Sequence, residues 1–506
     1  MKGKVYLVGA GPGNPKLLTI KALECLKKAD IVLYDCLISK EILNSLDIQA
    51  ELLCVGKRAT KHKFGQEEIN RLLLKAAEEK GNVVRLKGGD SFVFGRGGEE
   101  AEFLMENGVQ VEIVPGVTSS LAVPAYAGIA LTHRDYSSEL TIVTGRGKEG
   151  ALVDFSRIAK SKTLVILMGL LEIERITKEL IKFGRSKNEP VAVIRWGSRS
   201  CQQTVVGTLC DISGKVKDLG PPAIIVVGEV VRLREKLNWF ESRPLFGKKI
   251  VVTRARSQAS ELKEQLEDYG AQAIEFPTIG IAPLPSYEKL NGAIKRIRDY
   301  DWIIFTSQNG VDYFFRQMFK EKKDSRELRG IKIAAIGPRT TERLREFGLV
   351  ADFQPEEYVA EAIVSGLKKE GVAGKKILIP RALVAREDLV LDLRESGAEV
   401  DLVPCYQTLK EEGGKEEIEK LLENKEIDLI TFTSSSTVSN FCSSFDQALL
   451  KEVRAAVIGP ITQKTALRAG LKVEIVAKEY TIPGLVESIV KNYGSLPNLS
   501  KEYHCS

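Results

Sequence analysis

Apolar segments with the length of β-strands recur through the first half of the 506-residue chain, and most are followed at once by glycine or polar residues. They alternate with helical stretches, which predicts an α/β fold with a parallel or mixed sheet. Because the carboxyl ends of parallel strands share one edge, the residues after them should gather where such sheets bind ligands. The expected strands are Val5–Gly9, Ile31–Tyr34, Leu52–Val55, Val83–Leu86, Val111–Val114, Leu140–Val143, Leu164–Leu167, Val191–Arg195 and Ile224–Val227.

The stretch Arg85–Glu100, RLKGGDSFVFGRGGEE, is the most distinctive segment that follows such a strand. Gly88 and Gly89 allow the backbone to approach a ligand closely, and Asp90 can accept hydrogen bonds from a ribose or an amine. Gly-Asp is also ordinary turn chemistry, so a surface turn is the alternative for this segment alone.

Composition narrows the classes of ligand. The formal net charge is +6, and arginines stand singly beside loop glycines rather than in dense basic runs with aromatic residues. This pattern favours a small polycarboxylate over a nucleic acid. Eight scattered cysteines and three histidines indicate neither a disulfide framework nor a metal site. Without a signal peptide or a long apolar run, the expected location is the cytoplasm, with no membrane partner.

The opening loop, Gly9-x-Gly11-x-Gly13, partly matches a dinucleotide-binding fingerprint. That fingerprint requires glycine where Asn14 stands, and Pro12 removes a backbone donor. A nicotinamide-dependent dehydrogenase is therefore the weaker alternative.

The second half contains an internal duplication. Asp301–Ser307 is echoed by Asp428–Ser434, and Ile333–Gly348 is echoed by Ala455–Gly470. Each repeat reads as strand, Thr-Ser turn, helix, strand, Ile-Gly-Pro turn and helix, which predicts two similar α/β lobes with a ligand cleft between them. A Thr-Ser pair at a helix N-terminus favours carboxylates, although simple helix capping explains part of the pattern.

Residues from about Lys4 to Phe240 resemble uroporphyrinogen-III C-methyltransferases. The motifs that carry the resemblance are VGAGPG at 8–13, VGKRA at 55–59, the stretch 85–100, VPGVTSS at 114–120, LTHRD at 131–135, LMG at 167–169 and LNWF at 237–240. We expect this domain to occupy residues 1–241. One departure is Ser91, where the family usually has proline.

The methyltransferase resemblance implies S-adenosylmethionine as methyl donor, Asp35 as proton acceptor, Lys57 as proton donor and a homodimer. The implied cofactor contacts are Pro12, Gly88, Gly89, Asp90, Val93, Thr118, Ser119, Met168 and Gly197.

Residues from about Lys248 to Tyr493 resemble uroporphyrinogen-III synthase. The matching motifs are VVTR at 251–254, TSQNGV at 306–311, IGP at 336–338, IPR at 379–381, VPCYQT at 403–408, TSSSTV at 433–438 and YTIPGL at 480–485. We expect this domain at 242–506, with one lobe from about 248–281 plus 409–493 and the other from about 286–402. The chain should cross between lobes near Ala282–Pro285 and Val403–Thr408.

The synthase resemblance implies closure of hydroxymethylbilane to uroporphyrinogen III with inversion of ring D, without a cofactor. Tyr406, in the motif of the second crossing, is the candidate acid. Residues expected to anchor the substrate are Arg254, Thr306, Ser307, Thr433 and Ser434.

Together the two resemblances predict a bifunctional enzyme of corrinoid or sirohaem synthesis. The C-terminal half would make uroporphyrinogen III, and the N-terminal half would methylate it twice to precorrin-2. The main rival is a two-lobed ligand-binding or regulatory protein with an inactive N-terminal half. The presence of Asp35, Lys57 and Gly88–Asp90 argues against that rival.

Overall fold

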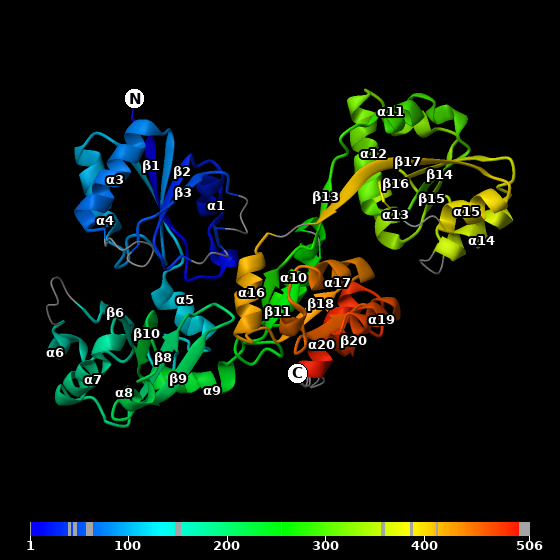
Figure 1. Cartoon of the computed structure of the whole chain (residues 1–506). Helices are drawn as coiled ribbons and strands as arrows, with labels where there is room; N and C mark the ends of the chain where they lie inside the picture. Colours follow the sequence, from blue (N-terminus) through cyan, green and yellow to red (C-terminus); the bar gives the residue numbers. More distant parts are fainter. Residues whose placement is uncertain are drawn as a thin grey trace, which may run out of the picture. The chain divides into compact units, whose positions relative to one another are not determined.

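The computed structural model describes residues 2–38, 42–43, 48–56, 64–146, 153–254, 256–355, 360–384, 388–410 and 413–494. In these ranges the chain forms four five-stranded sheets and divides into two compact units. Unit 1 comprises Met1–Lys248, Leu266–Gln272 and the residues from Tyr493 on, and unit 2 comprises Lys249–Gln265 and Ala273–Asn492 (Figure 1). The predicted domain limits at residues 241 and 242 stay a prediction.

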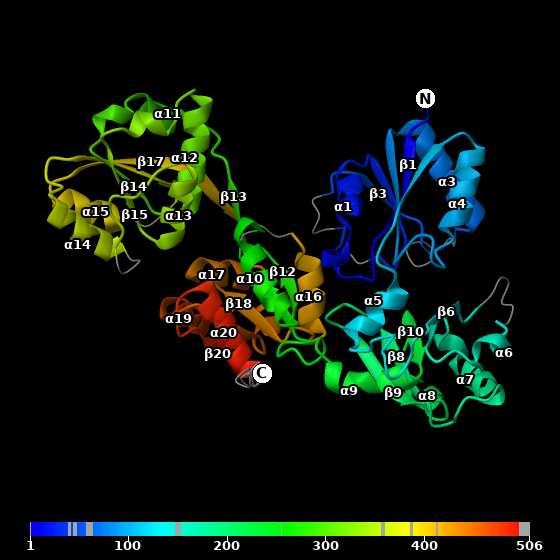
Figure 2. The same cartoon turned by 180° about the vertical axis from the view of Figure 1, so that it is seen from behind.

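The first sheet of unit 1 has the order β3-β2-β4-β1-β5, and all its strand pairs are parallel. Helices α3 and α4 pack on one face, and α1 packs on the other (Figures 1 and 2). Its elements are β1 (Lys4–Gly9), α1 (Ile20–Lys27), β2 (Ile31–Tyr34), β3 (Glu51–Cys54), α3 (Gln66–Glu79), β4 (Asn82–Lys87), α4 (Gly97–Glu106) and β5 (Gln110–Val114).

The second sheet of unit 1 has the order β6-β7-β10-β8-β9, and it is mixed because β10 runs antiparallel to both of its neighbours. Helix α5 packs on one face, and α6, α7 and α8 pack on the other. The elements are α5 (Ser119–Tyr126), β6 (Thr141–Thr144), α6 (Phe155–Ile158), β7 (Leu164–Leu167), α7 (Ile173–Lys182), β8 (Pro190–Arg195), β9 (Gln203–Thr208), α8 (Ile212–Lys215), β10 (Ala223–Val227) and α9 (Arg234–Leu237).

One expectation for this unit needs correction. The strand-end clusters do not share one edge, because they belong to two sheets. Asn14 caps the short 3-10 turn Pro15–Leu17, and Thr19 caps α1. Strand β9 (Gln203–Thr208) was missed because its sequence, QTVVGT, has only two adjacent apolar residues among polar ones and glycine.

Unit 2 confirms the internal duplication. Its sheets have the orders β12-β11-β18-β19-β20 and β13-β17-β16-β14-β15. The repeated strands pair in parallel in both, β14 with β15 and β18 with β19. Helices α13 and α19 each begin on the proline of an Ile-Gly-Pro turn.

The elements of the third sheet are β11 (Lys249–Val252), α10 (Arg256–Asp268), β12 (Gln272–Glu275), α16 (Lys415–Glu423), β18 (Leu429–Phe432), α17 (Ser435–Cys442), α18 (Gln447–Leu450), β19 (Arg454–Val457), α19 (Pro460–Arg468), β20 (Lys472–Val476) and α20 (Ile482–Tyr493). Those of the fourth are β13 (Ile279–Ala282), α11 (Glu288–Lys295), β14 (Trp302–Phe305), α12 (Gln308–Lys320), β15 (Lys332–Ala335), α13 (Pro338–Glu346), α14 (Ala360–Glu370), β16 (Lys376–Ala382), α15 (Asp388–Glu395) and β17 (Glu399–Lys410).

Of the two segments expected to cross between the lobes, Val403–Thr408 lies wholly within β17, whereas only Ala282 of the other belongs to a strand, β13. Strand β13 pairs antiparallel with the end of β17, with Ile281 opposite Thr408 and Ala282 opposite Gln407. Tyr406 therefore lies on a paired strand, which restricts the directions its side chain can take.

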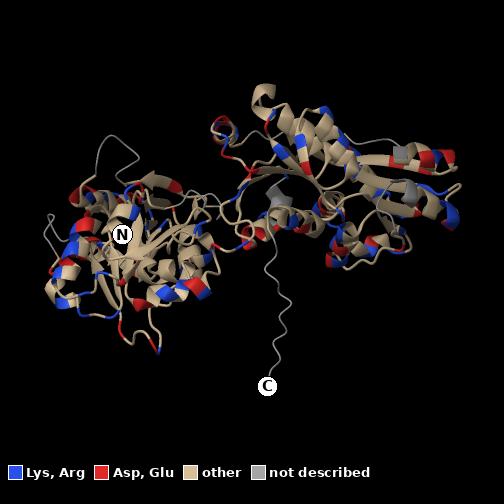
Figure 3. Cartoon of the chain, turned by 90° about the horizontal axis from the view of Figure 1, so that it is seen from below, with Lys and Arg blue, Asp and Glu red and all other residues tan. Residues whose placement is uncertain are grey.

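The surface carries both signs of charge. Lys and Arg are interspersed with Asp and Glu over the helices in the view of Figure 3. No helix in the described ranges has the length and hydropathy of a membrane span.

Candidate active sites

Three loops that follow β1, β4 and β5 meet at the carboxyl edge of the first sheet. Gly11 and Gly89 exchange backbone hydrogen bonds, with N···O distances of 3.0 and 2.7 Å. A Cβ atom on Gly116 would lie 2.4 Å from the Gly89 oxygen and 2.7 Å from the Gly9 Cα. Because no side chain fits there, the backbones of the three loops pack directly on one another. We call this glycine cluster, Gly9, Gly11, Gly89 and Gly116, the cradle.

Asp90 ties this cradle together. Its Oδ1 accepts a hydrogen bond from the Phe92 amide at 2.8 Å, and its Oδ2 accepts one from the Gly116 amide at 2.9 Å. Each carboxylate oxygen retains further acceptor capacity. The side chain thus has a structural function within the loops, and contact with a cofactor stays a prediction.

Replacing Asp90 by Ala is expected to weaken cofactor binding about 5- to 100-fold, because the part-buried Gly116 amide of the neighbouring loop loses its acceptor, at about 1–3 kcal/mol. Calorimetric titration with S-adenosylmethionine measures the change. The exposed helix substitution Glu102→Gln is the matched control, and unchanged affinity in Asp90→Ala would remove Asp90 from the site.

The loop after β8 of the second sheet adds Gly197 to the same region, and the predicted residue Met168 follows β7 of that sheet. A Cβ atom on Gly197 would lie 2.4 Å from Val123 of α5, and one on Gly13 would lie 3.8 Å from the Gly197 oxygen. The Asn14 amide donates to the Ser198 hydroxyl at 3.3 Å. These contacts bring the loop after β8 beside the loop after β1.

Unfavourable backbone conformations are concentrated in these loops. Seven non-glycine residues in the described ranges have positive φ, and five of them belong to the loops after β4, β7 and β8. Those five are Phe94, Arg96, Met168, Trp196 and Ser198. Such conformations cluster at ligand sites because the surrounding fold must hold them, so they support a functional role here.

The other predicted cofactor residues lie in the same loops. Thr118 precedes α5, and its hydroxyl lies 3.0 Å from that of Ser120. Ser119 lies close to Gly89, because a Cβ atom placed on Gly89 would be 3.1 Å from the Ser119 hydroxyl oxygen. Pro12 is half-buried, and Val93 is exposed.

Ser91 is fully buried, and its hydroxyl has no hydrogen-bond partner in the described part of the chain. Its carbonyl accepts from the Gly97 amide at 3.0 Å, so the backbone of this loop is held despite the absence of proline.

Asp35 follows β2 at the same edge of the first sheet, and Arg85 of the neighbouring strand β4 holds its side chain. Arg85 donates to its Oδ1 at 2.6 Å, and the Asp35 side chain remains 28% exposed. A partly exposed carboxylate in a fixed orientation is suited to accept a proton. Lys57 lies outside the described residues.

In unit 2 the structure brings Tyr406 and Ser307 together. Their hydroxyl oxygens are 3.2 Å apart, and Ser307 also accepts from the Gly310 amide at 3.0 Å as the N-cap of α12. Burial raises the pKa of Tyr406 above its ordinary value, and the Ser307 hydrogen bond partly offsets this. Thr306, the residue before Ser307, is half-buried.

Thr433, Ser434 and Arg254 belong to the other sheet of unit 2, at the ends of the adjacent parallel strands β18 and β11. Ser434 caps α17 in a reciprocal capping box with Thr437. Burial and then the neighbouring charge of Arg339 lower the pKa of Arg254. A desolvated arginine near a second one is suited to bind a carboxylate.

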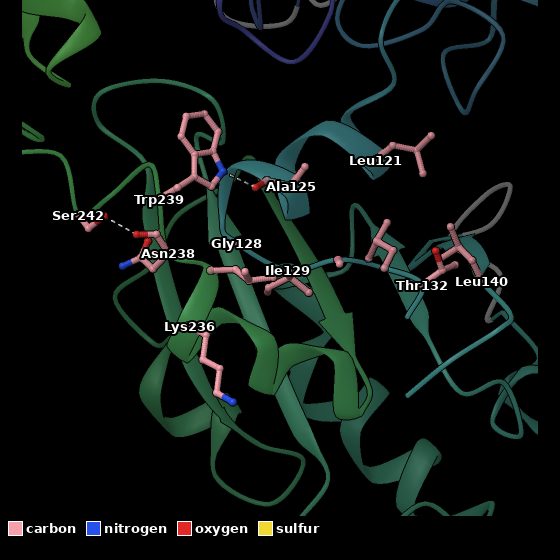
Figure 4. Close-up of a pocket in the computed structure, with 13 residues that line it drawn as sticks. Leu121, Ala125, Gly128, Ile129, Thr132, Leu140, Lys236, Asn238, Trp239 and Ser242 are labelled. Carbon is pink, nitrogen blue, oxygen red and sulfur yellow. Dashed lines mark hydrogen bonds between the residues drawn. The ribbon is translucent and has the colours of Figure 1, made fainter. Parts of the chain in front are cut away.

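A cavity of about 800 Å³ lies elsewhere in unit 1, and no predicted site residue lines it. It is formed by one side of α5 and by the segments at 128–132 and 236–242 (Figure 4). At its edge Trp239 Nε1 donates to the Ala125 carbonyl at 3.0 Å. In the described ranges, no group of three or more His, Cys, Asp or Glu residues could hold a metal ion.

Two family models cover most of the chain. Tetrapyrrole (Corrin/Porphyrin) Methylases match residues 4–213, and Uroporphyrinogen-III synthase HemD matches residues 260–487. Porphyrin biosynthesis protein HemD of Ruminiclostridium josui is 40% identical over 494 residues, or 97% of this chain and 98% of that protein. The chain belongs to both families. We call residues 1–241 the methylase half and residues 242–506 the synthase half.

Two further relatives match the methylase half. Uroporphyrinogen-III C-methyltransferase of Methanocaldococcus jannaschii is 52% identical over 239 residues, which cover 46% of this chain and 98% of that protein. A solved structure of uroporphyrin-III C-methyl transferase from Thermus thermophilus, complexed with S-adenyl homocysteine, is 44% identical, with a TM-score of 0.42. It covers 46% of this chain and 100% of that one.

Sequence reasoning missed three charged residues of the methylase half: Arg85, Lys87 and Glu100, all almost fully buried. The sequence did contain a signal for them. Arg85 and Lys87 are two positions apart on β4, so both side chains point to the same face of the sheet. Residues of this kind are rarely buried unless they are paired.

The methylase half is anchored at its end by Glu241. Its carboxylate accepts from Gln202 Nε2 at 2.7 Å, from the Thr204 hydroxyl at 2.5 Å and from Arg234. All three donors lie before residue 241, so a fragment that ends there keeps these bonds.

We therefore expect a fragment of residues 1–241 to fold and to methylate supplied uroporphyrinogen III at a rate near that of the full chain. The same fragment with Glu241→Ala should lose about 1–3 kcal/mol of stability, because Gln202, Thr204 and Arg234 lose a part-buried acceptor. Thermal unfolding and methyl transfer measure the two effects. A folded but inactive 1–241 fragment would show that the synthase half completes the site.

Proposed function

We propose that the chain is a bifunctional enzyme that makes uroporphyrinogen III in its synthase half and methylates it twice to precorrin-2 in its methylase half. The observation that carries the proposal is the fusion of the two families in one chain, together with a relative matched along almost its whole length. The product of one half is then the substrate of the other. Precorrin-2 would lead to sirohaem or to corrinoids such as cobalamin.

In the methylase half, the cradle of Gly9, Gly11, Gly89 and Gly116 fits a cofactor that needs close backbone approach. S-adenosylmethionine, when bound, supplies a methyl group on a sulfonium. Attack by an electron-rich pyrrole carbon is a displacement, so the main task of the loops is to position the reactants. The carbon that takes the methyl group carries no hydrogen, so charge balance requires the tetrapyrrole to lose a proton from a pyrrole N–H or a bridging methylene group. Asp35 is the proposed acceptor of that proton, and Lys57 is the proposed proton donor.

In the synthase half, Tyr406 is the proposed acid. Ring closure expels the hydroxyl of hydroxymethylbilane as water, and a proton from Tyr406 would assist its departure. A tyrosine hydroxyl, with an ordinary pKa of ~10, is protonated at neutral pH, and burial raises the pKa of Tyr406 further. Arg254, Thr306, Ser307, Thr433 and Ser434 would hold substrate carboxylates while ring D inverts.

One experiment tests both activities. The purified protein is supplied with hydroxymethylbilane, with and without S-adenosylmethionine, and products are identified by mass and isomer. We expect uroporphyrinogen III without the methyl donor and a dimethylated product with it. Binding without turnover would favour the ligand-binding alternative, and affinity for a dinucleotide instead of S-adenosylmethionine would favour a dehydrogenase.

We also propose that the methylase half forms a homodimer. Leu121, Leu237 and Trp239 are each 46–47% exposed, and all three line the 800 Å³ cavity. Clustered exposed apolar side chains are typical of protein interfaces.

Leu121→Glu is expected to weaken the dimer at least about tenfold, because a charge would be buried in an apolar contact. Sedimentation velocity measures the dissociation constant. Leu171, which is 68% exposed and does not line the cavity, provides the control Leu171→Glu. If both variants sediment as the unchanged protein does, this face is not the interface.

A further inference from the structure

A line of buried charged side chains runs beneath Asp35, from strand β4 to helix α4. Arg85 is 2% exposed, Lys87 is 4% exposed and Glu100 is fully buried. Taking such groups out of water is costly, and a buried ion pair often contributes little to stability. Stability alone is therefore a weak explanation for this arrangement under the candidate base.

The contacts form a continuous chain. Glu100 Oε1 accepts from Lys87 Nζ at 2.9 Å, from Gln66 Nε2 at 3.1 Å and from Arg85 Nε at 3.2 Å. Arg85 Nη2 donates to Asp35 Oδ1 at 2.6 Å. The Arg85 guanidinium thus bridges the buried carboxylate of Glu100 and the partly exposed carboxylate of Asp35. Because the guanidinium is planar and rigid, it fixes the orientation of both carboxylates.

The two carboxylate oxygens of Asp35 have different surroundings. Oδ1 is engaged by Arg85, whereas Oδ2 makes no hydrogen bond with any residue in the described ranges. Oδ2 is consequently the oxygen available to a substrate. Burial, and then the charge of Arg85, lower the pKa of Lys87, as expected for two close cations that share one anion.

We infer that Arg85 is a positioning residue for methyl transfer, which holds Asp35 through Oδ1, and that Glu100 holds Arg85 in place. The inference rests on the proposed function, in which Asp35 accepts the proton. Glu100 has no exposed surface and cannot touch a substrate. Any effect of Glu100 on turnover must therefore pass through its neighbours, and it should change kcat rather than KM.

The first test compares Glu100→Gln with Glu99→Gln in the full chain. Glu99 is the exposed neighbour on α4 that pairs with Arg96, and it serves as the control. We expect Glu100→Gln to lower kcat for methyl transfer up to about 100-fold, the cost of misplacing a reacting group by about 1 Å, with KM and affinity for S-adenosylmethionine unchanged. Cofactor binding by calorimetry shows that the cradle is folded. A normal kcat in a folded Glu100→Gln would overturn the inference.

The second test is a double-mutant cycle between Arg85→Lys and Asp35→Asn. Lysine keeps the positive charge but lacks the planar guanidinium that donates to Asp35 and Glu100 at the same time. If Arg85 acts through Asp35, Arg85→Lys lowers kcat in the unchanged chain and has no further effect when Asp35 is already Asn. The same fold-loss in both backgrounds would mean that Arg85 acts otherwise, and it would overturn the inference. Full turnover in Asp35→Asn alone would instead contradict the proposed role of Asp35, so the two failures are distinguishable.

Discussion

Asp35→Asn is expected to slow methyl transfer to uroporphyrinogen III about 10²–10⁴-fold, which is the usual effect of losing one proton-transfer group. The amide has nearly the shape of the carboxylate but cannot accept the proton that the tetrapyrrole loses after methylation. Transfer of a labelled methyl group from S-adenosylmethionine measures the rate. Asp35 does not belong to the glycine cradle, so affinity for S-adenosylmethionine should change little in calorimetry.

The exposed carboxylate of Glu24 on α1 provides the matched control, Glu24→Gln, which should leave the rate unchanged. Ring closure by the synthase half should also be unaffected in both variants. Near-normal methyl transfer by Asp35→Asn would reduce Asp35 to a structural partner of Arg85.

Tyr406→Phe is expected to slow formation of the type III isomer by about 10²–10⁴-fold, as for the loss of a general acid. Hydroxymethylbilane also closes without help to the symmetric type I isomer, so the product should shift towards type I. Phenylalanine keeps the packing of the ring, which is 8% exposed and 5.7 Å from the ring of Tyr313. Chromatographic separation of the isomers measures the shift.

The neighbouring Tyr313→Phe removes a hydroxyl from the same core and should retain type III product. Normal type III yield in Tyr406→Phe, with lost stability in Tyr406→Ala, would show that Tyr406 only packs the strand.

The pH dependence of ring closure offers a further check on Tyr406. An acid must be protonated to act, and burial raises the pKa of this phenol. Activity should therefore persist on the alkaline side up to at least the ordinary tyrosine pKa of ~10. A decline that begins near neutral pH would indicate another acid.

Much of this protein was determined by local sequence. All nine strands expected in the first half exist within about one residue of their predicted ends, because buried strands are continuous apolar runs. The duplication was equally visible, since Thr-Ser and Ile-Gly-Pro turns cap helices through nearest-neighbour geometry.

Which of these loops meet depends instead on contacts between distant segments. The sequence placed Arg85, Lys87 and Glu100 in one informative stretch, but their convergence beneath Asp35 depends on the β2–β4 pairing and on the packing of α4. Likewise, Ser307 and Tyr406 are 99 residues apart and meet through the order of strands in their sheet. Backbone propensity and hydrophobic periodicity act over a few residues, whereas charge pairing and sheet order are fixed by contacts between distant segments. The sequence therefore determined the elements and the chemistry of each loop, and the tertiary structure determined which residues share a site.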